Sequence, residues 1–260
     1  NPSKYPFKQE SAVCKCTSES CEIDSKAISL FPQQRIIRDY MQFDSPYRGI
    51  LLYHELGSGK TAASIATAEG YINKKKVFII TPASLSQNYE NELINVSKLG
   101  LDLKKSWTLL SINKTNTNAI KKINEYGIKS KFIKFNKGVG LVWIPLYKND
   151  IEDSITVKNN IKYSSMISED KTSIDETISH IIRNRYSFIN YNGLTQKKID
   201  ELGKDSFNDS FIVIDEVHNF ISRVVNGSKL ARAIYDLLMT SKNIKMVLLS
   251  GTPIINNPYE

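Results

Sequence analysis

The sequence predicts an α/β fold in which helices flank a parallel β-sheet. Short apolar runs typical of buried strands recur along the chain, and segments typical of helices follow most of them. The run at residues 49–53 precedes a glycine-containing segment and the small helix-forming residues 62–68. A second run, 211–214, ends in the acidic pair Asp215 and Glu216. Because parallel strands end at one edge of a sheet, we expect the acidic pair to face the glycine segment.

The other predicted elements follow the same rules of spacing. Pro32 suits the first turn of a helix, and Pro82 ends the second buried strand. A serine at position 84 or 86 is a suitable cap for the helix that follows. The remaining predicted helices span 32–41, 84–96, 173–183, 196–202 and 230–238, and the remaining predicted strands span 76–81, 107–112, 186–191 and 245–249.

Residues 98–183 are predicted to be a lysine-rich and β-rich insertion. Between residues 98 and 137, ten lysines oppose two carboxylates, which accounts for the formal net charge of +8. Such a field favours a polyanionic partner, with a merely solvated lysine-rich face as the equal alternative. Strands are expected at 139–144, 154–157 and 161–163, and Asn159 and Asn160 are expected to form the turn of a hairpin.

The segment from His54 to Thr61 has the composition of a phosphate-binding loop. Its glycines let successive N–H groups point at one anion, and the following helix adds the positive end of its dipole. Lys60 is expected to bind the β- and γ-phosphates of ATP, and Thr61 is expected to bind Mg²⁺. The general pattern has glycine where His54 stands, so the loop is a variant. The predicted loop residues are Gly57, Ser58, Gly59, Lys60 and Thr61.

The acidic pair completes a predicted site for phosphoryl transfer to water. Asp215 is expected to hold Mg²⁺, usually through water, and Glu216 to orient and deprotonate the attacking water. Glu216 and Lys60 are therefore the predicted catalytic residues. His218 is predicted to hydrogen-bond toward Ser250 or Thr252 and to respond to the nucleotide state, with a loop-capping histidine as the alternative.

The composition excludes several other classes of protein. With 260 residues, 41% of them hydrophobic, the chain has enough apolar surface for one large α/β domain. No run is long and apolar enough for a membrane span, and no secretion signal opens the chain. Cys14, Cys16 and Cys21 are too few for a disulfide framework or a four-ligand zinc site, so free thiols in a mobile N-terminal arm, residues 1–28, are expected.

Together these segments resemble the first motor lobe of superfamily 2 helicases and translocases, over residues 31–257 except the middle of the chain. Thr81–Leu85 with Asn88 and Glu92 is similar to the chromatin-remodeller branch rather than to DEAD-box RNA helicases. Within that branch the chain most resembles poxvirus-type transcription ATPases, such as the early transcription factor helicase subunit and nucleoside triphosphate phosphohydrolase I. The matching segments are Gln34, Leu56–Thr61, Thr81–Leu85, Ile189–Leu194, Asp215–His218 and Ser250–Asn257.

The resemblance implies a RecA-like lobe over residues 29–260 that uses ATP and Mg²⁺. It implies that Gln34 recognises adenine and that the backbone of DNA is bound by Ser84, Leu85, Asn190 and Tyr191. It further implies viral transcription, with a viral RNA polymerase or transcription factor subunit as partner, in the cytoplasmic viral factory or the virion.

Two alternatives to a DNA translocase stay open from the sequence. One is an RNA helicase lobe, and the other is a nucleotide-dependent switch that recruits polymerase. The motifs of a second motor lobe do not occur within these 260 residues. Because this family hydrolyses ATP in the cleft between two lobes, we expect the isolated chain to bind nucleotide weakly and hydrolyse it slowly.

Overall fold

A computed structural model describes residues 31–54, 57–72, 74–96, 106–112, 120, 123–124, 128–129, 133–136, 139–145 and 158–252. The predicted arm at 1–28, the three cysteines and the predicted strand at 154–157 lie outside these ranges.

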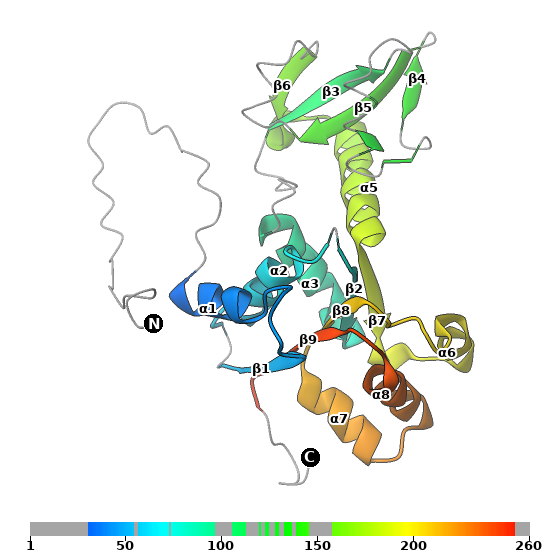
Figure 1. Cartoon of the computed structure of the whole chain (residues 1–260). Coiled ribbons are helices and arrows are strands. Elements are labelled where there is room, and N and C mark those ends of the chain that lie inside the picture. Colours follow the sequence, from blue (N-terminus) through cyan, green and yellow to red (C-terminus); the bar gives the residue numbers. More distant parts are fainter. Residues whose placement is uncertain are drawn as a thin grey trace.

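The larger of two sheets contains five strands, all parallel, in the order β1-β9-β8-β2-β7 (Figure 1). Parallel pairing places the carboxyl ends of all five strands at one edge, which confirms the predicted fold class. The strands are β1 (Gly49–Tyr53), β2 (Lys76–Thr81), β7 (Tyr186–Asn190), β8 (Ser210–Ile214) and β9 (Lys245–Ser250).

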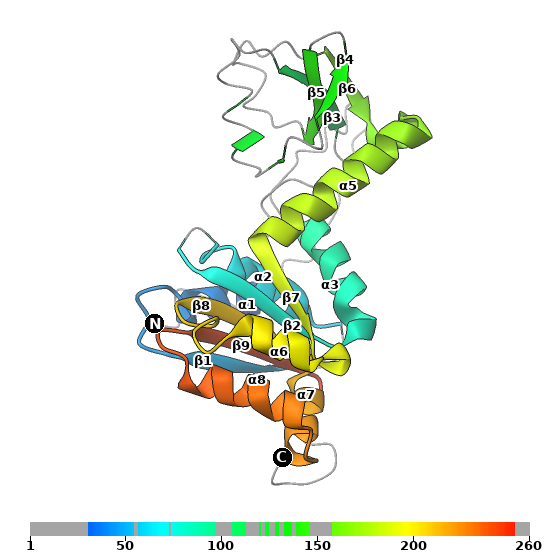
Figure 2. The same cartoon turned by 90° about the vertical axis from the view of Figure 1, so that its right-hand side faces the viewer.

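Helices cover both faces of this sheet, which explains why its central strands are apolar without alternation. In β2, Val77 and Ile79 pack on one face, whereas Phe78 and Ile80 pack on the other. Figure 2 shows the two helical layers above and below the sheet. The first layer contains α1 (Pro32–Tyr40), α2 (Lys60–Ala68) and α3 (Ala83–Val96), and the second contains α6 (Gln196–Leu202), α7 (Val217–Val225) and α8 (Lys229–Thr240).

The insertion forms a second, antiparallel sheet in the order β4-β5-β3-β6 (Figure 1). Helix α5 (Ser168–Arg185) runs from this sheet to β7, and its buried isoleucines join one hydrophobic core with Trp107 and Val142 of the small sheet. The strands of the small sheet are β3 (Ser106–Ile112), β4 (Lys134–Asn136), β5 (Val139–Pro145) and β6 (Lys158–Lys162).

The predicted turn at Asn159 and Asn160 is wrong. Both residues lie inside β6, which pairs antiparallel with β3 over Ser106 to Leu109. The tendency of Asn-Asn to form turns is a weak local preference. A strand that completes a sheet through distant pairing overrides it.

Two helices also differ from expectation. Helix α5 begins at Ser168 rather than near residue 173, with Glu169 and Asp170 in its first turn, where carboxylates favour the helix dipole. Helix α7 was not predicted, although it buries Val217 and Phe220 on one side. Among the helices of the described ranges, none is long and apolar enough to cross a membrane.

Ile79 tests the contribution of the central strands to stability. The side chain of Ile79 is fully buried in β2, whereas Ile167 is 65% exposed. We expect Ile79→Ala to lower the free energy of unfolding by about 2–5 kcal/mol, because the cavity cannot collapse between two packed layers. Urea denaturation measures the loss, and Ile167→Ala is the matched control. Equal effects of the two variants would contradict the assignment of the core.

Candidate functional site

The loop after β1 has the backbone of an anion-binding turn. Gly57 and Gly59 adopt φ values of 80° and 76°, a conformation that side chains disfavour. Helix α2 begins directly after Gly59, with no acidic residue in its first turn. The Ser58 hydroxyl is buried and has no hydrogen-bond partner among the described residues. Curled backbone, a helix N-terminus and an unsatisfied hydroxyl together suit a phosphate group.

Two side chains donate hydrogen bonds to backbone carbonyls of this loop. The Lys60 ammonium donates a hydrogen bond of 2.6 Å to the His54 carbonyl. Gln34, only 4% exposed, donates from Nε2 to the Gly59 carbonyl at 3.1 Å. A Cβ at position 59 would come within 2.6 Å of that nitrogen, so this contact also requires glycine. Gln34 is therefore fixed beside the loop, and its recognition of adenine stays a prediction.

Asp215 lies at the carboxyl end of β8, the same edge as the loop. Its N–H donates to the Ile80 carbonyl at 2.8 Å, and its Oδ1 accepts from the N–H of Glu216 at 3.0 Å. Burial, followed by the charge of Glu216, raises the pKa of Asp215 to about 6, while the Lys60 ammonium opposes the shift. The lysine of the loop and the carboxylate of β8 thus share one electrostatic environment.

The structure adds Glu92 of α3 to this group. Its carboxylate accepts hydrogen bonds from the Thr61 hydroxyl and the Ala62 N–H, while burial raises its pKa. One turn earlier, the hydroxyls of Tyr89 and Ser64 lie 2.7 Å apart in the buried contact between α3 and α2. The sequence places Glu92 in a family motif but predicts no role for it. The spacing of three residues from Tyr89 is the signal that puts both on one face.

His218 connects the acidic pair with the end of β9. Its Nδ1 lies 2.9 Å from Oγ of Ser250 and 3.4 Å from Oε2 of Glu216. The Thr252 N–H donates to the same serine oxygen at 3.2 Å. The structure therefore brings His218, Ser250 and Thr252 together, and their response to nucleotide stays a prediction.

The residues expected to contact nucleic acid lie at the ends of adjacent strands. Ser84 is exposed and Leu85 half-buried in the first turn of α3, after β2. Asn190 ends β7 in register with the last residue of β2. Tyr191 differs from expectation: its side chain is only 3% exposed, and its hydroxyl donates to the Glu216 carbonyl at 3.2 Å. Its ring is therefore directed toward the acidic pair instead of a surface ligand.

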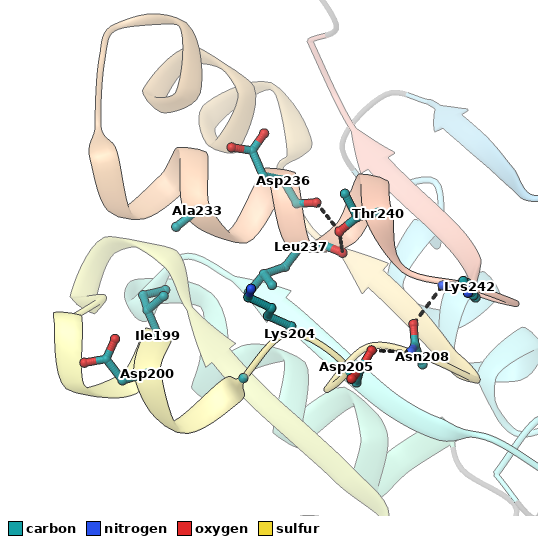
Figure 3. A pocket seen from close by; sticks show the side chains of 11 residues that line it. Ile199, Asp200, Lys204, Asp205, Asn208, Ala233, Asp236, Leu237, Thr240 and Lys242 are labelled. Carbon is teal, nitrogen blue, oxygen red and sulfur yellow. Dashed lines mark hydrogen bonds between the residues drawn. The ribbon is translucent and has the colours of Figure 1, made fainter.

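A separate pocket of about 680 Å³ lies between α6, α8 and the segment that leads into β8 (Figure 3). Asn208 and Lys242 line it, and both precede the first residues of β8 and β9. Asp215 and Ser250 lie at the other ends of those strands. The pocket is therefore at the opposite edge of the sheet from the phosphate loop and takes no part in the candidate site.

Comparison with known proteins identifies the family. The family described as "Type III restriction enzyme, res subunit" matches residues 28–255, nearly the whole chain. The chain belongs to this helicase family. The motor-lobe resemblance of its sequence is thereby confirmed at the level of the family.

Relatives of the chain occur in large DNA viruses. R563 of Acanthamoeba polyphaga mimivirus, named as an ATP-dependent RNA helicase, is 25% identical over 99% of this chain and 34% of its own length. The termination factor NPH-I homolog of African swine fever virus is 21% identical over 82% of this chain and 21% of its own length. Helicase 087L of Invertebrate iridescent virus 3 is 25% identical over 89% of this chain and 19% of its own length. The chain thus spans about a third or less of these proteins.

The raised pKa of Asp215 predicts a pH-dependent stability in metal-free and nucleotide-free buffer. The folded carboxyl binds its proton more tightly than the unfolded one, so the folded state holds more protons between about pH 4 and 6. Stability contributed by this group therefore falls as the pH rises through that range. We expect Asp215→Asn to stabilise the protein by roughly 3 kcal/mol at pH 7.5 and very little near pH 4.

Chemical denaturation of wild type and variant at the two pH values measures this difference. Asp200→Asn is the control, because Asp200 is exposed and should show the same small effect at both values. A stabilisation by Asp215→Asn that does not change with pH would contradict the electrostatic origin.

Proposed function

We propose that the chain is the ATP-binding motor lobe of a nucleic-acid-dependent ATPase that translocates on DNA. The observation that supports this most strongly is the shared edge of the sheet. Lys60, at the start of α2, acts electrostatically on Asp215 at the end of β8. Such a pairing of a lysine loop with a strand-end carboxylate suits a metal-bound triphosphate.

The phosphate loop supplies positioning and charge. The N–H groups that follow Gly57 and Gly59 and the start of α2 hold the phosphate oxygens, and the Lys60 ammonium balances charge on the β- and γ-phosphates. In the present arrangement this ammonium donates to the His54 carbonyl. It must turn from that carbonyl toward the phosphates when nucleotide binds. Gln34 lies beside the same loop and recognises adenine.

Thr61 and Asp215 would hold Mg²⁺, and Glu216 is the proposed general base. The metal, when bound, neutralises developing charge on the phosphate oxygens. Glu216 accepts a proton from the attacking water, which then attacks the γ-phosphorus in line with the leaving oxygen. The Oε2 of Glu216 lies within reach of His218, which is fixed to Ser250. We propose that this chain of contacts transmits the state of the nucleotide to the segment after β9.

Nucleic acid is proposed to lie over the carboxyl ends of β2 and β7. Ser84, Leu85 and Asn190 are positioned there at the ends of adjacent strands. Contacts of this kind address the phosphate backbone, so binding is independent of base sequence and weakens with salt. The relative R563 carries the name of an RNA helicase, which makes RNA the second candidate substrate.

The inserted small sheet is proposed to serve a partner rather than the reaction. Its strands lie between α3 and β7, within the insertion proposed over residues 98–183 of a lobe at 29–260, and α5 leads from it to β7. The African swine fever virus relative is named as a termination factor homolog. We therefore propose a role in viral transcription, with a viral RNA polymerase or transcription factor subunit as partner, in the viral factory or the virion.

Two substitutions in the full-length protein test the proposed roles. We expect Lys60→Ala to weaken ATP binding and to abolish hydrolysis, because the phosphates lose their balancing charge. Glu216→Gln should keep ATP binding and lower kcat by roughly 10²–10⁴-fold, because only the base is lost. Fluorescent-nucleotide titration and steady-state phosphate release separate the two effects. Lys204→Ala and Glu201→Gln, both exposed, are matched controls, and unaltered turnover in Glu216→Gln would overturn the mechanism.

The nature of the nucleic acid is tested by stimulation of the same ATPase. We expect duplex DNA to raise kcat more than RNA of the same sequence and length, and the stimulation to decline steeply with salt. Stimulation by RNA alone would replace DNA with RNA as substrate. Stimulation by neither would favour the nucleotide-dependent switch.

A further inference from the structure

The backbone of Glu216 adopts a conformation that requires support. Its φ and ψ are 48° and 52°, in the left-handed region that a residue with a side chain seldom occupies. The residue ends the connection from β8 and immediately precedes α7. Its N–H donates to Oδ1 of Asp215 at 3.0 Å, and its carbonyl accepts from the N–H of Asn219 at 2.9 Å. Both partners are close in sequence, and Asp215 is itself held to β2 through its N–H bond to the Ile80 carbonyl.

Tyr191 makes a long-range hydrogen bond to this backbone. Its hydroxyl donates to the Glu216 carbonyl at 3.2 Å, from a position directly after β7. In the sheet, β2 separates β7 from β8, so the side chain of Tyr191 spans the end of an intervening strand. Its ring centroid lies 5.7 Å from that of Phe220 in α7. The tyrosine thus contacts both the residue before α7 and a buried side chain within α7.

The surroundings of Tyr191 keep its hydroxyl a donor. The side chain is 3% exposed, and burial together with the charges of Asp215 and Glu216 raises the pKa of its hydroxyl. A phenol in this position stays protonated over the whole working range of an enzyme. Since Asn190 ends β7 and Tyr191 follows it at the edge proposed for nucleic acid, movement of that segment would act directly on Glu216.

We propose that Tyr191 is a positioning residue: its hydroxyl fixes the backbone of Glu216 and so couples the segment after β7 to the carboxylate that activates water. The inference rests on the proposed function, because it assigns Glu216 as the base. It differs from a packing role for the ring, which would need only the aromatic side chain. Phenylalanine keeps that ring and removes only the hydrogen bond, so it separates the two roles.

The test is Tyr191→Phe in the full-length protein, measured by nucleic-acid-stimulated ATP hydrolysis. We expect kcat to fall about fivefold, the loss of one hydrogen bond, with KM for ATP and the melting temperature close to wild type. Tyr186→Phe is the matched control. Tyr186 is equally buried at the other end of β7, and its hydroxyl donates to Glu69. This control should leave kcat unchanged.

Each outcome distinguishes the inference from the function on which it rests. If Glu216→Gln abolishes turnover but Tyr191→Phe keeps wild-type kcat, the positioning role is wrong and the proposed function stands. If Glu216→Gln also keeps wild-type turnover, the proposed function itself fails. A fall in kcat that Tyr186→Phe reproduces, or that accompanies an equal rise in KM and a lower melting temperature, would assign Tyr191 to packing alone.

Discussion

The parallel register of β1, β9 and β8 is the constraint on which the candidate site depends. Tyr53, Ser250 and Ile214 end these neighbouring strands, so the segments that follow them emerge at one edge of the sheet. The phosphate loop follows β1, and the acidic pair follows β8. The two segments are far apart in the sequence, and the sheet brings the Lys60 ammonium close enough to act on the charge of Asp215. A slip of either strand by one residue would separate charge from counter-charge and turn the apolar side chains to the wrong helical layer.

Several helices are connected to this edge by polar contacts within an otherwise apolar core. Glu92 joins α3 to the start of α2, and His218 joins α7 to the end of β9. Buried polar contacts of this kind contribute little net stability when complete, but they are costly when one partner is removed. They therefore restrict the relative movement of the elements more than they stabilise them. Helix α3, which carries Ser84 and Leu85 of the proposed nucleic-acid path, is thus also the helix whose Glu92 contacts Thr61.

Sequence patterns predict what is local, and they fail where distant segments decide. The five parallel strands were predictable because each is a short and mainly apolar run, and the phosphate loop because its glycines and Lys60 lie within four successive residues. The strand at Lys158–Lys162 was predicted only from residue 161, because its pairing with β3 bridges some fifty residues and overrides the Asn159-Asn160 turn signal. The burial of Tyr191 was equally hidden, since its partner Glu216 lies 25 positions away and follows β8, a strand that is not a neighbour of β7. Family resemblance implied that Tyr191 contacts the backbone of DNA, and it gave no sign that the side chain would be only 3% exposed.

The electrostatics of the site explain why a bound cation would complete it. Burial and the charge of Glu216 raise the pKa of Asp215 more strongly than Lys60 lowers it, and Glu92 adds a further repulsive charge. In the absence of ligand the carboxylates therefore repel one another in a poorly solvated environment, at a cost to stability. A divalent cation beside Asp215 would reverse the sign of that interaction and favour the ionised carboxylate. Under the proposed function, the same burial would strengthen the attraction between Asp215 and a bound cation, because the interaction strengthens as water is excluded.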